Sequence, residues 1–281
     1  MEKTKAFLIF AFLSILLLSS FAGPAFAGAH DLVVIRPGGP TASDEAQGQV
    51  TSLIKQIARQ AGWTAESATA RYFNKEDEGV QYLSSNKPGF ALITPGIYLK
   101  YRQKFGLTPI NKIIMSNSAT IRYHIVARKG TAKSLADLKG KILAGAHLAE
   151  PEYVQKVVLE NALILGKDVT IKAVSGLSAL RSLKSGEVFA VLLDDKELAS
   201  LPSLPFANQF ETIFSCRPIT NTGIMLVGKN AGAADVEALA RACRNFCASA
   251  EGKAVCDTFE INGFEPTTPD AYADLLARWG K

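Results

Sequence analysis

Polar and glycine-rich segments follow four apolar runs of this 281-residue chain, at points where parallel strands would end. In open α/β sheets, ligands bind outside the carboxyl ends of the strands, where helix N-termini direct unpaired N–H groups into a crevice. We therefore treat these four segments as candidate ligand-binding positions. They contain Gly38, Gly39 and Thr41; Thr94 and Tyr98; His147; and Asp194 and Asp195.

The first two segments offer neutral groups that could bind an anion. In Pro37-Gly-Gly-Pro-Thr41 the glycines allow a close backbone approach, and the start of the following helix could bind an anion. An ordinary strand–helix turn explains the same pattern. In Thr94-Pro-Gly-Ile-Tyr98 a hydroxyl and a phenol lie one turn apart at a helix start, although Tyr98 could equally be a core residue.

The other two segments contain titratable groups. His147 follows a buried strand and precedes a helix, so it could donate to a ligand, but a lone histidine is also a common structural residue. A carboxylate at Asp194 or Asp195 could accept a hydrogen bond from a ligand, or it could cap the next helix.

Alternating strands and helices must position these groups. Apolar residues at helical spacing predict helices over about 43–62 and 95–106. Phe-Ala-Leu-Ile-Thr-Pro at 90–95 is mirrored by Phe-Ala-Val-Leu-Leu-Asp at 189–194, which indicates a weak internal repeat. We therefore expect two α/β lobes, each with a mostly parallel sheet flanked by helices, rather than one barrel. The C-terminal region is predicted to be helical, at about 233–249, 252–260 and 269–279.

Residues 1–27 are typical of a cleavable signal peptide. A positively charged start precedes an apolar run over 6–22, Gly23-Pro24 breaks that run, and Ala25-Phe-Ala27 supplies the small residues of a cleavage site. An uncleaved anchor is the alternative, since the run is near the lower limit for spanning a membrane. No cysteine lies near the junction, so we expect a released rather than a lipid-anchored protein.

Composition and missing motifs disfavour several classes of function. Without the first 27 residues the chain has 29 basic and 25 acidic residues, and this mild, scattered charge disfavours nucleic acid as a partner. There is no P-loop, His-Glu-x-x-His, Gly-x-Ser-x-Gly or Cys-x-x-Cys motif. The three histidines are far apart in the sequence. We therefore expect a binding protein rather than an enzyme, with no cofactor and no metal.

The cysteines of an exported chain favour disulfides over metal binding. Cys243 and Cys247 are four residues apart on a predicted helix, where a local bridge would strain the bond geometry. Cys247–Cys256, across two consecutive helices, is the more plausible pair. Cys216, Cys243, Cys247 and Cys256 allow three patterns of disulfide pairing, and buried free thiols are the alternative.

Four further stretches occur in a characteristic order. Ile121-Arg-Tyr-His-Ile-Val-Ala-Arg-Lys-Gly130 precedes Ser134-Leu-Ala-Asp-Leu-Lys-Gly-Lys141, and Gly186-Glu-Val-Phe-Ala-Val and Ile261-Asn-Gly-Phe-Glu-Pro follow. Together they resemble the periplasmic solute-binding proteins of ABC transporters, in the branch that binds phosphonate, phosphite and phosphate-like solutes. The first two are similar to that family's crossover into its second lobe.

This resemblance implies a type 2 periplasmic binding fold, in which two lobes close on a solute without changing it. Lobe 1 would comprise 28–120 and 228–281, and lobe 2 would comprise 121–227. Tyr98 and one of Asp194 and Asp195 match solute contacts, and a return loop would bring Asn221 and Thr222 to the cleft.

The resemblance also implies a role. The protein would be a periplasmic monomer that delivers a small polar solute, with a phosphonate-like oxyanion favoured, to an inner-membrane ABC permease. The alternatives are a binding protein that reports ligand occupancy to a membrane sensor, and an exported enzyme on the same fold.

One segment departs from the phosphonate binders. They have Ser-Thr-Ser-Gly at the helix start of the second lobe, whereas this chain has His147-Leu-Ala-Glu150, and their downstream histidine has no counterpart near Gly176-Leu177. Glu150 or Glu152 would repel a dianion unless it is protonated or turned away. The residues therefore leave the solute unnamed.

Overall fold

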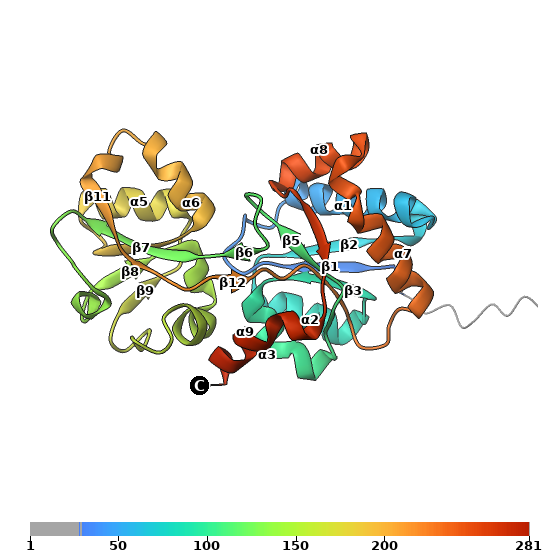
Figure 1. The fold of residues 1–281 in the computed structure, drawn as a ribbon, viewed down its shortest axis with the longest axis horizontal. Coiled ribbons are helices and arrows are strands. Elements are labelled where there is room, and N and C mark those ends of the chain that lie inside the picture. The colour runs from blue at the N-terminus through green and yellow to red at the C-terminus, as the bar shows by residue number, and fades with distance from the viewer. Residues whose placement is uncertain (1–27, 29, 281) are drawn as a thin grey trace, which may run out of the picture.

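The computed structural model describes residue 28 and residues 30–280, which form two α/β lobes side by side (Figure 1). The predicted signal peptide, residues 1–27, lies outside the described residues. Within the described part of the chain, no helix has both the length and the apolar character needed to cross a membrane.

The sheet of lobe 1 has the strand order β2-β1-β3-β13-β4. β1 pairs in parallel with β2 and β3, whereas β13 pairs antiparallel with β3 and β4. Its strands are Leu32–Ile35 (β1), Ala70–Phe73 (β2), Phe90–Ile93 (β3), Thr108–Pro109 (β4) and Ile224–Leu226 (β13).

The sheet of lobe 2 has the order β11-β7-β10-β8-β9. β8 pairs in parallel with β9 and β10, and β7 pairs antiparallel with β10 and β11. Its strands are Tyr123–Arg128 (β7), Ile142–Ala144 (β8), Thr170–Lys172 (β9), Ala190–Asp194 (β10) and Phe210–Ser215 (β11).

In each sheet four of the five strands run in the same direction, as predicted, and one strand, β13 or β7, runs against them. The chain enters lobe 2 through β6 (Thr120–Ile121) and leaves it through β12 (Ile219–Thr220), and these two short strands pair antiparallel between the lobes (Figure 1). The strands that continue these crossings, β7 and β13, run against the parallel strands of their sheets. β13 lies in the first sheet, so the chain returns to lobe 1 before Ile224, inside the range 121–227 that was predicted for lobe 2.

Helices cover both faces of the first sheet. In Figure 1, α1, α7 and α8 lie on one side of this sheet and α2, α3 and α9 lie on the other. Their bounds are Asp44–Ala61 (α1), Glu76–Asn86 (α2), Pro95–Phe105 (α3), Ala233–Arg244 (α7), Ala250–Phe259 (α8) and Ala273–Trp279 (α9).

Local signals in the sequence explain the ends of α1 and α3. The Ser43 hydroxyl accepts the N–H of Ala46 at the start of α1, and Gly62 ends that helix in the left-handed conformation, with φ of 77°. Thr94 caps α3, and the following proline occupies the first turn, where its missing N–H costs nothing. The predicted boundaries of both helices are confirmed.

Two regions contain elements that were not predicted from the sequence. After Glu150 the chain forms a short α4 (Pro151–Tyr153) that continues as a π-helix (Val154–Val158) and ends before Glu160 and Asn161, both at positive φ. In the C-terminal region, Gly263–Pro266 is a strand, β14, that pairs with β5 (Asn111–Ile114). The remaining helices of lobe 2 are α5 (Gly176–Ser185) and α6 (Asp195–Ser200).

One hydrophobic cluster extends through both lobes. Ile93 and Ile97 of lobe 1 belong to the same buried cluster as Leu148 and Val154 of lobe 2. Side chains buried between the lobes lose water on both sides, which stabilises the contact by the hydrophobic effect. The structure is therefore that of lobes in the closed position.

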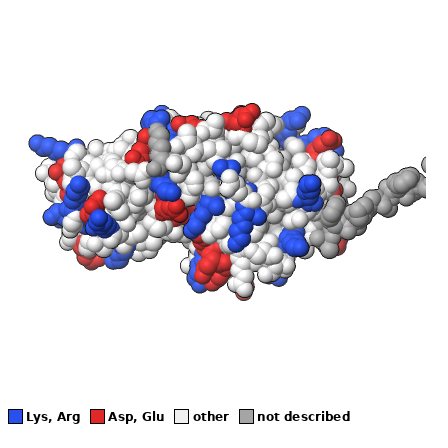
Figure 2. Space-filling view, turned by 90° about the horizontal axis from the view of Figure 1, so that it is seen from below, with Lys and Arg blue, Asp and Glu red and all other residues white. Residues whose placement is uncertain are grey.

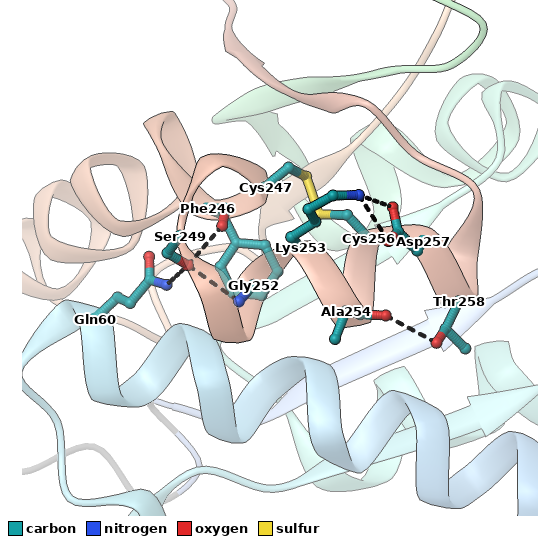
Figure 3. Close-up of a disulfide and its surroundings, with 10 residues drawn as sticks. All are labelled: Gln60, Phe246, Cys247, Ser249, Gly252, Lys253, Ala254, Cys256, Asp257 and Thr258. Atoms are coloured by element: carbon teal, nitrogen blue, oxygen red, sulfur yellow. Dashed lines mark hydrogen bonds and ion pairs between the residues drawn. A yellow bond between two sulfur atoms is a disulfide. The ribbon is translucent and has the colours of Figure 1, made fainter.

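A disulfide joins Cys247 to Cys256 across the turn before α8 (Figure 3), which is the pair favoured from the sequence. Their Cα atoms are 5.6 Å apart, within the usual range for this bond. Cys216 and Cys243 are free and buried. Charged side chains of both signs are interspersed over the face of the molecule shown in Figure 2.

Candidate functional site

Loops at the carboxyl ends of four strands meet between the lobes. Gly38, after β1, lies against the 3₁₀ turn of lobe 2 that follows β8, because a Cβ at Gly38 would be 2.2 Å from the carbonyl oxygen of Ala146. Gly96, in the first turn of α3, touches lobe 2 as well, and a Cβ there would be 2.3 Å from Glu150 Oε1. The two glycines thus allow the backbones of the lobes to approach closely.

Thr94 and Glu150 connect the lobes directly. The Thr94 hydroxyl donates a hydrogen bond of 2.8 Å to Glu150 Oε1, and its oxygen also accepts the N–H of Ile97 at 3.4 Å. The N-terminus of a helix favours negative charge through its unpaired N–H groups and its dipole. The side chain of Glu150 therefore occupies an anion-binding position at the start of α3.

Burial raises the pKa of Glu150 to about 7. The hydrogen bond from Thr94 and the charge of His147 oppose this effect, and the carboxylate of Glu76 adds to it. Desolvation disfavours the charged form of a carboxyl group, and here it outweighs the favourable contacts. Glu150 consequently changes charge near neutral pH.

His147 lies beside two carboxylates at the start of α6, those of Asp194 and Glu197. Its Nε2 is 3.4 Å from Asp194 Oδ2 and 3.3 Å from Glu197 Oε2. Burial lowers the pKa of His147, but the two carboxylates outweigh burial and raise it to about 9. Burial also acts to raise the pKa of Asp194, whereas His147, the N–H of Glu197 and the charge of Arg36 hold it below its usual value. His147, Asp194 and Glu197 are the group of described residues whose donor atoms converge closely enough to hold a metal ion.

The carboxylates of this cluster are oriented by a reciprocal helix cap. Asp194 Oδ1 accepts the N–H of Glu197 at 2.8 Å, and Glu197 Oε2 accepts the N–H of Asp194 at 3.1 Å. This capping box satisfies two N–H groups at the start of α6. Asp194 therefore caps α6 with Oδ1 and also faces His147 with Oδ2, so the helix-cap role does not exclude a place at the candidate site.

Asp195 points instead to the connection between the lobes. Its Oδ2 accepts the N–H of Arg122 at 2.6 Å, and its Oδ1 lies 3.0 Å from His124 Nε2. His124 Nδ1 in turn bonds to Ser215 Oγ on β11. These contacts stabilise the entry into lobe 2.

Tyr98 is buried in the aromatic wall between the lobes. Its ring packs against Tyr272 with the ring centroids 5.1 Å apart, and only 3% of the residue is exposed. In lobe 2, Tyr123 contacts His147 edge-on at 4.9 Å and Tyr153 at 6.0 Å. The core alternative for Tyr98 is therefore the one realised in the closed structure.

Asn221 and Thr222 use their polar groups within the protein. Thr222 donates to the carbonyl oxygen of Ile93, the last residue of β3, and Asn221 donates to the carbonyl oxygen of Ile113. Both residues are buried. Through these bonds they hold the return crossing against lobe 1.

Gly39 and Thr41 lie away from the contact between the lobes. Gly39 faces the Tyr72 hydroxyl and Arg36, and Thr41 is exposed before α1. The ordinary-turn alternative thus applies to this part of the loop, whereas Gly38 lies at the site. The structure therefore brings together Gly38, Thr94, His147 and Asp194 of the candidate residues.

Three residues of this candidate site were not predicted from the sequence. Glu150 was noted only as a departure from the resembled family, and Glu197 and Arg36 were not considered. Asp194-Asp-Lys-Glu197 has the spacing of a capping box, so this local signal could have indicated Glu197. Arg36 is the last residue before Pro37 and no local signal distinguishes it from other surface arginines.

One protein family matches residues 40–272, and its description is the periplasmic substrate-binding protein of a phosphonate ABC transporter. No curated protein sequence matches the chain.

Solved structures share the fold at low sequence identity. A Xanthomonas citri protein bound to ATP has a TM-score of 0.70 at 15% identity, over 89% of this chain and 96% of that chain. A binding-protein component of a phosphonate ABC transporter from Pseudomonas aeruginosa has a TM-score of 0.65 at 14% identity, over 85% and 82%. PhnD1 from Prochlorococcus marinus in complex with methylphosphonate has a TM-score of 0.62 at 15% identity, over 89% and 97%. These likenesses establish the fold, which is the type 2 periplasmic binding fold expected from the sequence.

Proposed function

Because the chain belongs to the family of periplasmic substrate-binding proteins of phosphonate ABC transporters, we propose that it captures a small oxyanion between its lobes. It then delivers this solute to an inner-membrane permease and does not change it chemically. Residues 1–27 direct export and are cleaved, and the mature protein acts as a monomer without a nucleic-acid partner. Lobe 1 comprises residues 28–119 and 222–280, and lobe 2 comprises the residues between the two crossings.

The position of the Glu150 carboxylate supports the oxyanion. This carboxylate comes from lobe 2 and accepts a hydrogen bond from Thr94 at the start of α3 in lobe 1. A phosphonate offers oxygens of the same kind, with more negative charge, to the same helix start. In the closed form the Glu150 carboxylate thus occupies the position proposed for an oxygen of the solute.

Exchange of Glu150 for the solute requires the lobes to separate. Gly38 and Gly96 are packed against lobe 2 in the closed form, so the helix start of α3 is accessible only after opening. The crossings through β6 and β12 are two-residue strands that can act as hinges. A solute that binds the closed form more tightly than the open form shifts the population towards closure, and the permease recognises the closed form.

The proposed solute contacts are a subset of the residues named from the sequence. Thr94 donates its hydroxyl, Gly38 allows close backbone approach, and His147 is the cationic group of lobe 2. Tyr98 forms part of the apolar wall. Asp195, Asn221 and Thr222 act on the crossings and position the lobes rather than contact the solute.

A ligand screen tests this proposal. Thermal unfolding is measured with methylphosphonate, phosphate, phosphite, sulfate and glutamate, and a ligand present at 100 times its Kd stabilises the protein by about 2.7 kcal/mol. Methylphosphonate or a related oxyanion is expected to raise the unfolding temperature, and Thr94→Val is expected to reduce that rise. Thr258→Val is the matched control, because Thr258 is exposed and its hydroxyl donates to the carbonyl oxygen of Ala254 within α8. Absence of a rise with every oxyanion would overturn the proposal.

A further inference from the structure

Three possible metal-ligand atoms converge on the face of lobe 2 that meets lobe 1. His147 Nε2, one oxygen of Asp194 and one oxygen of Glu197 lie within 4.8 Å of one another. The two distances from Nε2 to these oxygens are 3.4 and 3.3 Å. Zinc bonds of 2.0–2.2 Å at tetrahedral angles imply separations of roughly 3.4 Å between ligand atoms. The two nitrogen–oxygen distances match those of a tetrahedral site.

The histidine nitrogen forms ion pairs with Asp194 and Glu197 but makes no hydrogen bond within the protein. Nε2 is shielded from solvent and makes no hydrogen bond, although two carboxylate oxygens are near. Both oxygens are beyond the usual N–H···O distance of 2.7–3.2 Å. A buried polar atom without a hydrogen bond is uncommon and calls for an explanation, and a bound cation would supply one. Here the atom is directed towards the place where a cation would be held by all three groups.

The carboxylates are held in position before any ion binds. Asp194 Oδ1 and Glu197 Oε2 are fixed by the capping box of α6, which leaves Asp194 Oδ2 to face the histidine. Gly176 allows Glu197 to lie against the start of α5, because a Cβ there would be 2.3 Å from Glu197 Oε1. Groups that fix the ligands in this way strengthen metal binding.

The backbone turn that contains His147 and a neighbouring aromatic ring also hold the histidine in position. It lies in the 3₁₀ turn Ala146–Ala149 that follows Gly145, whose φ is 153°, and its ring is in edge contact with the ring of Tyr123. A Cβ at Gly145 would be 2.4 Å from the carbonyl oxygen of Leu192 on β10, so this turn and the strand preceding Asp194 are locked together. The three ligands thus belong to one rigid unit within lobe 2.

We propose that His147, Asp194 and Glu197 bind one divalent metal ion of the zinc class. One imidazole nitrogen and two carboxylate oxygens suit zinc and similar ions, and three protein ligands leave a fourth position open. The ion takes the position between nitrogen and oxygens and neutralises the two carboxylates. It requires a deprotonated imidazole, so the proton on Nε2 leaves to solvent when the metal binds.

The open coordination position of the metal affects solute binding, an inference that rests on the proposed function. Lobe 2 presents Asp194, Glu197 and Glu150 to the cleft, and these groups repel an oxyanion when they are charged. A bound dication reverses this repulsion, and an oxyanion oxygen can complete its coordination. The metal site would therefore raise the affinity for the solute, while binding of the metal itself needs no solute.

Metal titration of the full mature chain tests the site. Protein freed of metal with a chelator is titrated with Zn²⁺ by calorimetry in the absence of any solute, and with Co²⁺ by visible absorption. We expect one Zn²⁺ per chain and the intense visible bands of four-coordinate Co²⁺. Failure of the wild-type protein to bind one equivalent would overturn the proposal, whatever the variants do.

Variants locate the bound ion. His147→Ala and Glu197→Gln are each expected to weaken Zn²⁺ binding by more than about 10-fold, and Gly176→Ala by about 10-fold through displacement of Glu197. Glu197→Gln keeps an oxygen for the N–H of Asp194, so it preserves the helix cap if His147→Ala fails to fold. His30→Gln is the matched control, since His30 pairs with the single carboxylate of Asp235 at 3.1 Å. Equal loss in the control, or no loss in the cluster variants, contradicts the assignment.

Solute titrations with and without Zn²⁺ separate the two proposals. Zinc binding without any oxyanion binding leaves the metal site standing and rejects the proposed function. Oxyanion binding without zinc binding rejects the metal site and leaves the proposed function.

Discussion

The hydroxyl of Thr94 in lobe 1 donates a hydrogen bond of 2.8 Å to the carboxylate of Glu150 in lobe 2. This bond joins residues 56 positions apart and places an internal anion at the start of α3. The closed form therefore has two competing occupants for one position, Glu150 and the solute. The first predictions concern this competition.

Glu150→Gln is expected to bind methylphosphonate about 10-fold more tightly than the wild type at pH 8. The amide keeps a hydrogen-bonding oxygen for Thr94 but has no charge, and removal of a like charge at short range is worth about 1–2 kcal/mol. Calorimetric titration measures the change. Glu152→Gln is the matched control, because Glu152 is exposed and pairs with Lys156 at 3.1 Å. Weaker binding by Glu150→Gln would show that the carboxylate holds the solute rather than competing with it.

The stability of the wild type relative to Glu150→Gln is expected to fall as the pH rises from about 4.5 to 7. The pKa of Glu150 is raised from 4.5 to about 7 in the folded protein, so the folded state holds a proton that the unfolded state has lost. Stability falls with pH wherever the folded state binds more protons. Denaturant unfolding of both proteins at several pH values between 4 and 8.5 gives the difference.

That difference should be flat above pH 8, since Glu150 is then charged in both states. A difference that rises with pH would mean that the folded protein stabilises the charged carboxylate.

Gly96→Ala is expected to favour the open form. Its Cβ would be 2.3 Å from Glu150 Oε1 and 2.9 Å from Tyr153 Cβ, so the lobes cannot close without a shift. Solution scattering should show a larger radius of gyration, and calorimetry should show weaker solute binding.

Gly48→Ala in α1 is the matched control for that substitution. No atom lies within 4 Å of a Cβ at Gly48, so alanine is accommodated and stabilises the helix by about 0.5–1 kcal/mol. Identical scattering of Gly96→Ala and the wild type would argue against a closed resting form.

Loss of the disulfide is expected to destabilise the protein by about 2–3 kcal/mol, because the bond closes a short loop of the unfolded chain. Cys247 and Cys256 are separated by 9 positions. The double variant Cys247→Ser/Cys256→Ser is compared with the wild type by denaturant unfolding, with and without reductant. Reductant should lower the stability of the wild type only, since Cys216 and Cys243 are free thiols. A reductant effect on the double variant would indicate a different pairing.

Short-range signals made much of the architecture predictable. The caps at Ser43, Gly62 and Thr94 are local hydrogen bonds and backbone conformations, so they depend on only a few neighbouring residues. Strand β10 and the disulfide between Cys247 and Cys256 were likewise expected. The family resemblance is confirmed by the match over residues 40–272.

The directions of strands were harder to predict. β13 pairs antiparallel because the chain returns from the other lobe, and no residue within Ile224–Leu226 encodes that direction. β14 was missed because Gly263–Pro266 is stabilised by its partner β5, whose residues lie about 150 positions earlier.

The sequence by itself determined where strands end and which polar groups stand there, because these features depend on periodicity, caps and turn residues. Only the tertiary structure decided which of those groups meet. It turned Asn221 and Thr222 to carbonyl oxygens of lobe 1, and it placed His147 between Asp194 and Glu197. It also brought Glu150 to Thr94. Such contacts join residues far apart in the chain, and they form because closing the lobes buries a shared hydrophobic cluster that no single segment specifies.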